Sequence, residues 1–243
     1  MAQRLFWAQL IAHLSIIPMV IYGEPIHFVG AFVMYFFTGC LGMSMTYHRL
    51  VAHGSWKAPR WFEIVGLIAA TLALTGSCIA WCGTHRTHHK YSDRLQDPHS
   101  PYHKGYFRAQ FLSMFEPLRL SSMKGFAGNR IYAFFHRYYW AINFGYMVIL
   151  VAIDPFALVY LYLFPACLIW NAGSLINTAG HRFGSQPYKT GDQSRNNVLL
   201  GILVWGEGWH NNHHRYPKSS QFGRKFWELD ISGLLIRMIE KKG

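Results

Sequence analysis

Long stretches without any charged residue most constrain how this chain can fold. Four of them contain no Asp, Glu, Lys or Arg: residues 5–23, 28–47, 138–153 and 156–176. Each approaches the ~20 apolar residues that a helix needs to cross ~30 Å of hydrocarbon, although the third does so only if Phe134 and Phe135 extend it. The segments between paired stretches, residues 22–27 and 154–155, contain a helix-stopping proline. The sequence therefore predicts an all-α integral membrane protein with four transmembrane helices in two hairpins.

The composition excludes most other classes of protein. Hydrophobic residues make up 51% of the chain and charged residues only 14%, whereas a typical soluble domain has roughly 25% charged residues. A disordered chain, a collagen or a coiled coil would need far more polar, charged or Gly- and Pro-rich sequence. A membrane protein is the class that remains.

The basic residues indicate how these helices face the membrane. The chain has 23 Lys and Arg against 11 Asp and Glu, which gives a net charge of +12. Neither hairpin turn contains Lys or Arg, so every basic residue lies on one side of the bilayer in this topology, and the positive-inside rule assigns that side to the cytoplasm. We expect a single domain, residues 1–243, with both termini cytosolic and a cytosolic cap formed by residues 48–137 and 177–243. The basic excess has no nucleic-acid-binding motif beside it, so we expect no nucleic-acid partner.

Two further apolar segments are predicted to lie against the cap rather than across the bilayer. Residues 61–82 are long enough to span, but Thr71, Thr75 and Ser77 interrupt them, and a crossing would put histidines on opposite membrane faces. We expect a buried or half-inserted element there. Residues 226–239 alternate apolar and polar side chains at helical spacing, which is typical of a helix lying in the membrane interface.

Nine of the fourteen histidines follow spacings that suit metal ligands. They are His48, His53, His85, His88, His89, His181, His210, His213 and His214. Residues three and four apart share a helix face, so residues 85–89 and residues 210–214 each predict a stripe of three imidazoles. An ideal helix turns by ~140° over five residues. His48 and His53 therefore either serve different metals or stand on either side of a helix end.

Nine imidazoles exceed the four ligands of one tetrahedral metal, so the sequence predicts two metal ions. Imidazole suits Zn, Cu, Fe or Ni, which leaves the identity of the metal open. We expect Asp93, Asp97 and Glu207 to orient histidines through hydrogen bonds rather than to bind metal. The remaining histidines are predicted to lie outside the metal site: His13, His27, His99, His103 and His136.

Five motifs surround the nine histidines between residues 47 and 227: H-R-L-x-x-H, H-R-T-H-H-K-Y-S-D, D-P-H-S-P, N-T-A-G-H and G-E-G-W-H-N-N-H-H. In type and order they resemble the membrane fatty-acid desaturases, specifically the Δ9, stearoyl-type branch. The resemblance implies that the nine histidines bind two iron ions (Fe2+/Fe3+) and that Asn177 contributes through water. It also implies O2-dependent removal of two hydrogens from adjacent methylenes of a saturated acyl chain, which forms a cis double bond at the Δ9 position.

The same resemblance implies a substrate tunnel and partners. Trp81, four residues before His85, matches a tunnel-lining tryptophan of the family, and Thr178 follows Asn177 where the acyl chain would bend; a packing role remains open for both. Animal members carry an arginine that contacts CoA at the position of Gly83, so the acyl carrier stays open among a membrane lipid, CoA and acyl carrier protein. We expect electrons from a separate protein of the ferredoxin or cytochrome b5 type.

Two other functions remain as alternatives. A hydroxylase of acyl or alkyl chains would use the same histidine-rich di-iron scaffold, and sequence chemistry separates it poorly from a desaturase. A histidine-rich divalent-metal transporter is the alternative from a different class. The spans disfavour transport, because His13 is the one His, Asp or Glu near the middle of any of them, and transport sites need such groups along the path.

Overall fold

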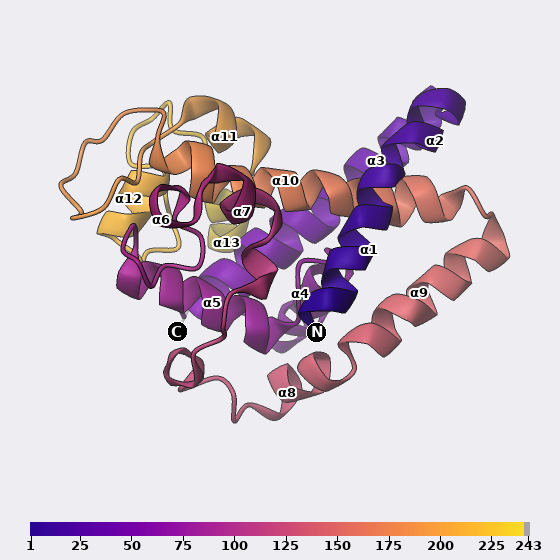
Figure 1. Ribbon diagram of the computed structural model, residues 1–243, viewed down its shortest axis with the longest axis horizontal. Coiled ribbons are helices and arrows are strands. Elements are labelled where there is room, and N and C mark those ends of the chain that lie inside the picture. Colours follow the sequence, from indigo (N-terminus) through magenta and orange to yellow (C-terminus); the bar gives the residue numbers. More distant parts are fainter. Residues whose placement is uncertain (241–243) are drawn as a thin grey trace.

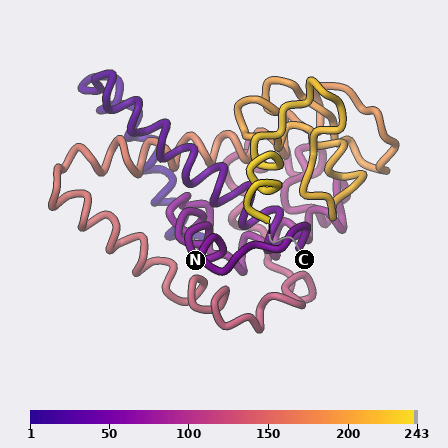
Figure 2. The backbone as a smooth tube through the Cα atoms, turned by 180° about the vertical axis from the view of Figure 1, so that it is seen from behind, coloured from indigo at the N-terminus to yellow at the C-terminus, as the bar shows by residue number. Residues whose placement is uncertain are grey.

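The computed structural model describes residues 1–240, and within that range every regular element is a helix, as predicted. Long helices extend to one side of the molecule, and short helices gather on the other (Figure 1). The turn between α2 (Ile16–Tyr22) and α3 (Pro25–Tyr35) and the turn between α9 (Tyr139–Ile153) and α10 (Phe164–Thr178) both lie far from the short helices, as Figures 1 and 2 show. Residues 241–243, the end of the predicted cap, lie outside the described residues.

Three helical segments of this part of the chain are long and apolar enough to cross a membrane. They are α1 (Ala2–Leu14) with α2 (Ile16–Tyr22), α3 (Pro25–Tyr35) with the π-helical η1 (Phe36–Ala52), and η4 (Val159–Leu163) with α10 (Phe164–Thr178) and η5 (Ala179–His181). The third predicted stretch forms α9 (Tyr139–Ile153), an apolar helix of 15 residues. Phe134 and Phe135 do not lengthen it, because they lie in the separate α8 (Arg130–Arg137).

Local hydrogen bonds close both predicted hairpin turns. Pro25 begins α3, and the Glu24 N–H donates to Nδ1 of His27 at 3.0 Å. In the second turn, Asp154 ends α9 and its Oδ1 accepts a hydrogen bond from the Phe156 N–H at 3.0 Å. A proline at the start of a helix needs no partner for its missing N–H, and the Asp side chain mimics a backbone turn.

Residues 61–82 form parts of two helices rather than one span. The chain breaks at Leu74 and Gly76, which have φ angles of 56° and 115°. The freed carbonyl of Leu74 accepts a hydrogen bond of 2.6 Å from the buried side chain of Gln9, as a buried break in a helix requires. The two helices are α4 (Arg60–Leu72), which buries one face, and α5 (Cys78–Tyr91).

Close packing against α4 fixes the position of η1. A Cβ on Gly42 would overlap the backbone of Ala70, and a Cβ on Gly66 would overlap the side chain of Thr46. Small residues at such contacts let two helix backbones approach closely. The end of η1 that carries His48 is therefore held firmly beside α4.

Seven short helices form the other side of the molecule: α6 (Pro101–Lys104), α7 (Tyr106–Phe111), η2 (Ser113–Phe115), η3 (Leu120–Met123), α11 (Val198–Leu203), α12 (His210–Arg215) and α13 (Ile231–Ile239). The predicted interface helix over residues 226–239 is wrong in its first five residues, since α13 begins only after Asp230, whose side chain accepts a hydrogen bond from the Gly233 N–H. The side chain of Ile236 is buried, and α13 packs against η1.

Candidate metal centre

The nine histidines selected by their spacing come together in two groups. The first histidine group contains His48, His53, His85, His89 and His213, and the second contains His88, His181, His210 and His214. Within each group, one ring nitrogen of every histidine lies within 4.8 Å of those of the others. The ring centres of His89 and His214, one from each group, lie 4.4 Å apart. The two groups are therefore immediate neighbours.

Each predicted stripe of three imidazoles divides between the two groups. On α5, His85 and His89 are one turn apart and belong to the first group, whereas His88 belongs to the second. On α12 the division is reversed, because His210 and His214 belong to the second group and His213 to the first. Two facing helices thus build two sites, each with a pair of rings from one helix and a single ring from the other.

His48 and His53 reach the same group because the helix winds more widely than an ideal α-helix. The His53 N–H donates to the His48 carbonyl at 3.1 Å, which is a π-type bond over five residues. That winding places residue i+5 nearly above residue i, and the two ring centres lie 5.0 Å apart. η1 ends at Ala52, between the two histidines. Of the two predicted alternatives, the structure therefore has the helix end between His48 and His53, and both rings face one site.

Carboxylates orient four of the histidines through Nδ1. The pairs are His48 with Glu207 at 2.5 Å, His88 with Asp97 at 3.0 Å, His181 with Asp93 at 2.8 Å and His214 with Asp192 at 2.6 Å. A proton on Nδ1 leaves the lone pair of the neutral ring on Nε2. Sequence reasoning predicted three of these carboxylates but missed Asp192, which lies in a loop where no periodicity marks it.

The Nε2 atoms converge inside each group. Contacts between Nε2 atoms join His48 to His213 at 3.0 Å, His53 to His85 at 2.8 Å, His89 to His213 at 2.9 Å and His181 to His210 at 3.0 Å. Within residues 1–240, the buried Nε2 atoms of His88 and His214 have no hydrogen-bond partner. Inward-facing lone pairs without donors are the arrangement that divalent transition metals require of imidazole. The residues present therefore fit two metal ions.

Burial favours the neutral form of four of these imidazoles, whereas Asp97 raises the pKa of a fifth, His88. Burial lowers the pKa of His85, His89 and His213 well below 6.5, and the neighbouring histidines lower it further. Burial also lowers the pKa of His214, to about 4, although the hydrogen bond that His214 Nδ1 donates to Asp192 acts in the opposite direction. Neutral imidazole is the form that binds a metal, so these rings are ready to bind one at neutral pH.

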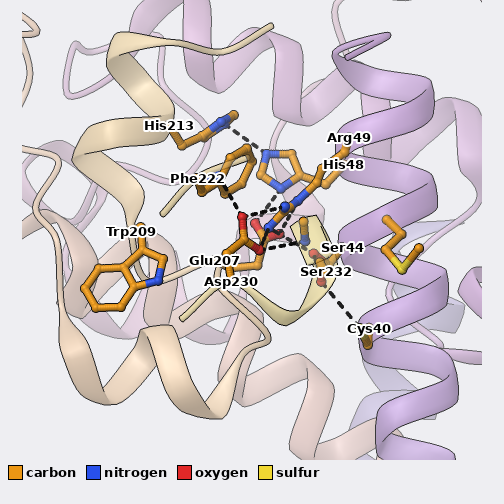
Figure 3. A network of polar contacts seen from close by, with 12 residues as sticks. Cys40, Ser44, His48, Arg49, Glu207, Trp209, His213, Phe222, Asp230 and Ser232 are labelled. Atoms are coloured by element: carbon orange, nitrogen blue, oxygen red, sulfur yellow. Dashed lines mark hydrogen bonds and ion pairs between the residues drawn. The ribbon is translucent and has the colours of Figure 1, made fainter. Parts of the chain in front are cut away.

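A buried arginine, which the sequence analysis did not single out, lies beside the first histidine group. Arg49 Nη2 lies 3.1 Å from Glu207 Oε1 and 2.9 Å from Asp230 Oδ1 (Figure 3). Burial raises the pKa of Glu207, but His48 and Arg49 lower it more strongly, to about 2. Glu207 is therefore an ionised hydrogen-bond acceptor for His48. An arginine next to a histidine in an otherwise apolar stretch was the available signal.

An apolar cavity of about 450 Å³ reaches the histidines, a volume within the range typical of ligand pockets. Leu5 of α1 and Met43 of η1 line it, and His48, His85 and His210 also contribute to its wall. Trp81 also lines it and stacks on His85, with ring centres 5.1 Å apart and an interplanar angle of 9°. A long apolar ligand in this cavity would lie beside both histidine groups.

Asn177 and Thr178 occupy different places. Asn177 lines the cavity, and its side-chain nitrogen donates to the Gly173 carbonyl at 3.4 Å. The Thr178 hydroxyl donates to Gln110 Oε1 at 3.0 Å, and the residue lines a separate hollow between α7 and α10.

Four of the five histidines expected outside the metal site have hydrogen-bond partners elsewhere. His13 contacts Gln9 and Asn171, His27 contacts Glu24, His103 contacts Asp93, and His136 contacts Ser77. None of these four, nor His99, belongs to either group in the described part of the chain. His99 and His136 line the cavity.

The chain is similar in sequence to a known protein family and to several known enzymes. Residues 25–231 match the family model described as fatty acid desaturase. The sn-1 stearoyl-lipid 9-desaturase of Anabaena variabilis is 33% identical over 219 residues, which are 88% of this chain and 80% of that protein. Delta-9 acyl-lipid desaturase 1 of Arabidopsis thaliana is 35% identical over 213 residues, covering 83% of this chain and 68% of that protein. The Acyl-CoA C20 Delta5-desaturase of Anemone leveillei is 33% identical over 225 residues, covering 87% and 70%. On these grounds the chain belongs to the fatty acid desaturase family.

Proposed function

We propose that this protein is an acyl-lipid 9-desaturase, which introduces a cis double bond into a saturated acyl chain attached to a membrane lipid. The observation that carries the proposal is the convergence of nine histidines in two groups, both of which contribute to the wall of one apolar cavity. The stearoyl-lipid and acyl-lipid 9-desaturases named above support the bond position and the lipid carrier.

The proposed reaction needs an oxidant and a reductant. Two C–H bonds on adjacent methylenes break and a C=C bond forms, while O2, two electrons and two protons complete the formation of two water molecules. The electrons would come from a one-electron carrier of the ferredoxin or cytochrome b5 type. An acidic carrier would be steered to the basic cytosolic face of a chain with a net charge of +12.

We assign two iron ions to the two histidine groups as the metals of this reaction. Bound iron supplies the activation of O2, which is needed because an unactivated C–H bond offers no acid-base handle. His48, His53, His85, His89 and His213 would hold one iron, and His88, His181, His210 and His214 the other, with Asn177 acting through water. The four carboxylates hold the protons on Nδ1 and keep the Nε2 lone pairs directed inward.

The cavity would position the acyl chain. Its apolar wall would hold the methylenes and exclude water. Trp81, which stacks on His85, would contact the acyl chain beside the first histidine group. Positioning to within about 1 Å is worth up to about 100-fold in rate. Of the two residues expected to contact substrate, we assign this role to Trp81, because Thr178 lines the hollow between α7 and α10 instead.

We propose that α9 completes a set of four membrane spans and that the histidine groups and both termini face the cytosol. The support is the distribution of charge, because neither hairpin turn contains Lys or Arg. The single domain of residues 1–243 would then place residues 48–137 and 177–243 in the cap.

Expression in a desaturase-deficient host tests the proposal. Gas chromatography of the host lipids should show a cis-9 monounsaturated product, bound to glycerolipid before it appears in other lipid pools. A hydroxylated product without an alkene would favour the hydroxylase, and metal flux in proteoliposomes without lipid turnover would favour the transporter. Either outcome would refute the desaturase.

A further inference from the structure

We propose that Arg49 is a positioning residue of the metal centre. It fastens the C-terminal segment, residues 220–232, against η1 and thereby holds His48 and His213 of the first histidine group. The inference rests on the metal centre of the proposed function, but it concerns contacts within the chain that exist without substrate.

The Arg49 side chain is fully buried and binds partners on two sides. Its Nη1 donates to the Ser220 carbonyl at 2.8 Å and to Asp230 Oδ2 at 3.0 Å, and its Nη2 and Nε donate to Glu207 Oε1 at 3.1 and 3.3 Å. The planar fork of guanidinium suits such simultaneous contacts, whereas the ammonium of lysine is a single point charge. Arg49 therefore joins η1, the loop before α12 and the C-terminal segment at one point.

The first route from Arg49 to a metal ligand runs through Glu207. One carboxylate oxygen, Oε1, accepts hydrogen bonds from Arg49 and from Ser44. The other, Oε2, lies 2.5 Å from Nδ1 of His48. Arg49 and Ser44 fix the position of Oε1 and so the orientation of the whole carboxylate. Oε2 then accepts a hydrogen bond from His48 Nδ1 only when the imidazole ring has the observed orientation. Arg49 thus sets the direction of the His48 ring without touching it.

The second route runs through Phe222. The guanidinium carbon of Arg49 lies 3.8 Å from the centre of the Phe222 ring, and the His213 ring lies 4.2 Å from it at an angle of 33°. Figure 3 shows Phe222 next to both residues. The Phe222 N–H also donates to Asp230 Oδ2 at 2.6 Å, so the partner of Arg49 fixes Phe222 as well.

The second histidine group has a separate set of supports. His88, His181 and His214 pair with Asp97, Asp93 and Asp192, and the described contacts of Arg49 include none of these six residues. Loss of the Arg49 contacts should therefore weaken one metal site and leave the other unchanged. A residue that merely stabilises the whole fold would affect both.

Titration of the purified, metal-free protein with Co2+ in detergent tests this expectation. In Arg49→Lys, one of the two dissociation constants should rise by about 10- to 100-fold, the range typical when a residue that orients a metal ligand is lost, while the other stays at the wild-type value. Asp192→Asn should weaken the other site, and the double variant should weaken both. Arg60→Lys, which changes an exposed arginine paired with Glu63, is the matched control and should change neither.

Three results would overturn the proposal: equal weakening of both sites in Arg49→Lys, no weakening of either, or a double variant that keeps one site intact. If Arg49→Lys does not fold, Phe222→Leu replaces it, since that change leaves both ion pairs in place; it should weaken the same single site by a smaller factor, and unchanged Co2+ binding would contradict the second route. The titration uses no substrate, so its outcome is distinct from a failure of the desaturase proposal, which shows as a wild-type protein without alkene product.

Discussion

His48 and His213 meet at their Nε2 atoms, 3.0 Å apart, although they lie 165 residues apart in the chain. The Nδ1 atom of His48 faces Glu207, which leaves Nε2 as the ring atom directed at His213. The contact brings ring nitrogens from η1 and α12 to one point in the first histidine group, as a shared metal ion would require.

The metal-free protein should lose stability as the pH falls below about 6.5. In the unfolded chain a histidine has a pKa near 6.5, whereas burial lowers the pKa of His214 to about 4 and those of His85 and His213 well below 6.5. Between these values the unfolded state binds more protons than the folded state, so protonation favours unfolding. Thermal unfolding in detergent should give a midpoint that falls as the pH drops from about 6.5 toward 4, because the histidines with lowered pKa values outnumber His88, whose pKa Asp97 raises. A midpoint that rises on acidification would contradict the neutral histidine groups.

His88→Ala and His213→Ala should each abolish product formation and remove iron from a different group. The structure places His88 in the second group and His213 in the first, so each variant should retain about one iron per chain instead of two, since each loses one ligand of one metal. Elemental analysis of purified protein measures the iron. His103→Ala, which changes an exposed histidine outside both groups, is the control and should keep full iron content.

Trp81→Ala should reduce desaturation without removing iron. The Trp81 ring stacks on His85 and lines the cavity. Its loss would leave one face of the His85 ring without a packing partner and would hold the acyl chain less firmly, which costs up to about 100-fold in rate. Trp81→Phe keeps an aromatic ring there and should recover most of the activity. Turnover and iron content are measured on the same preparations. Full activity in Trp81→Ala would exclude a role for this ring in positioning substrate.

Gly42→Val should destabilise the folded protein, because a Cβ at this position would overlap the backbone of Ala70. Overpacking of this kind costs ~1–3 kcal/mol. Gly145→Ala is the matched control, since a Cβ there meets no atom of the described structure. Thermal unfolding of both variants in the same detergent makes the comparison. Equal stability of the two variants would show that η1 and α4 are not held at close contact.

The helical class, both hairpin turns and the two triplet stripes were predictable, because charge-free length, proline and 3–4 spacing act locally. The division of each triplet between two groups was not, since it depends on how α5 faces α12. The shared site of His48 and His53 depends on π-type winding, which ordinary helical periodicity does not indicate. Asp192 and Asp230 were missed for a related reason: both act from irregular segments, where a contact over long sequence separation leaves no periodic signal.

A structure of the iron-loaded protein, with the metals located by their anomalous X-ray scattering, tests the central claim most directly. The account predicts two iron positions, one among His48, His53, His85, His89 and His213 and the other among His88, His181, His210 and His214. A single iron shared by all nine histidines, or irons bound outside both groups, would contradict it.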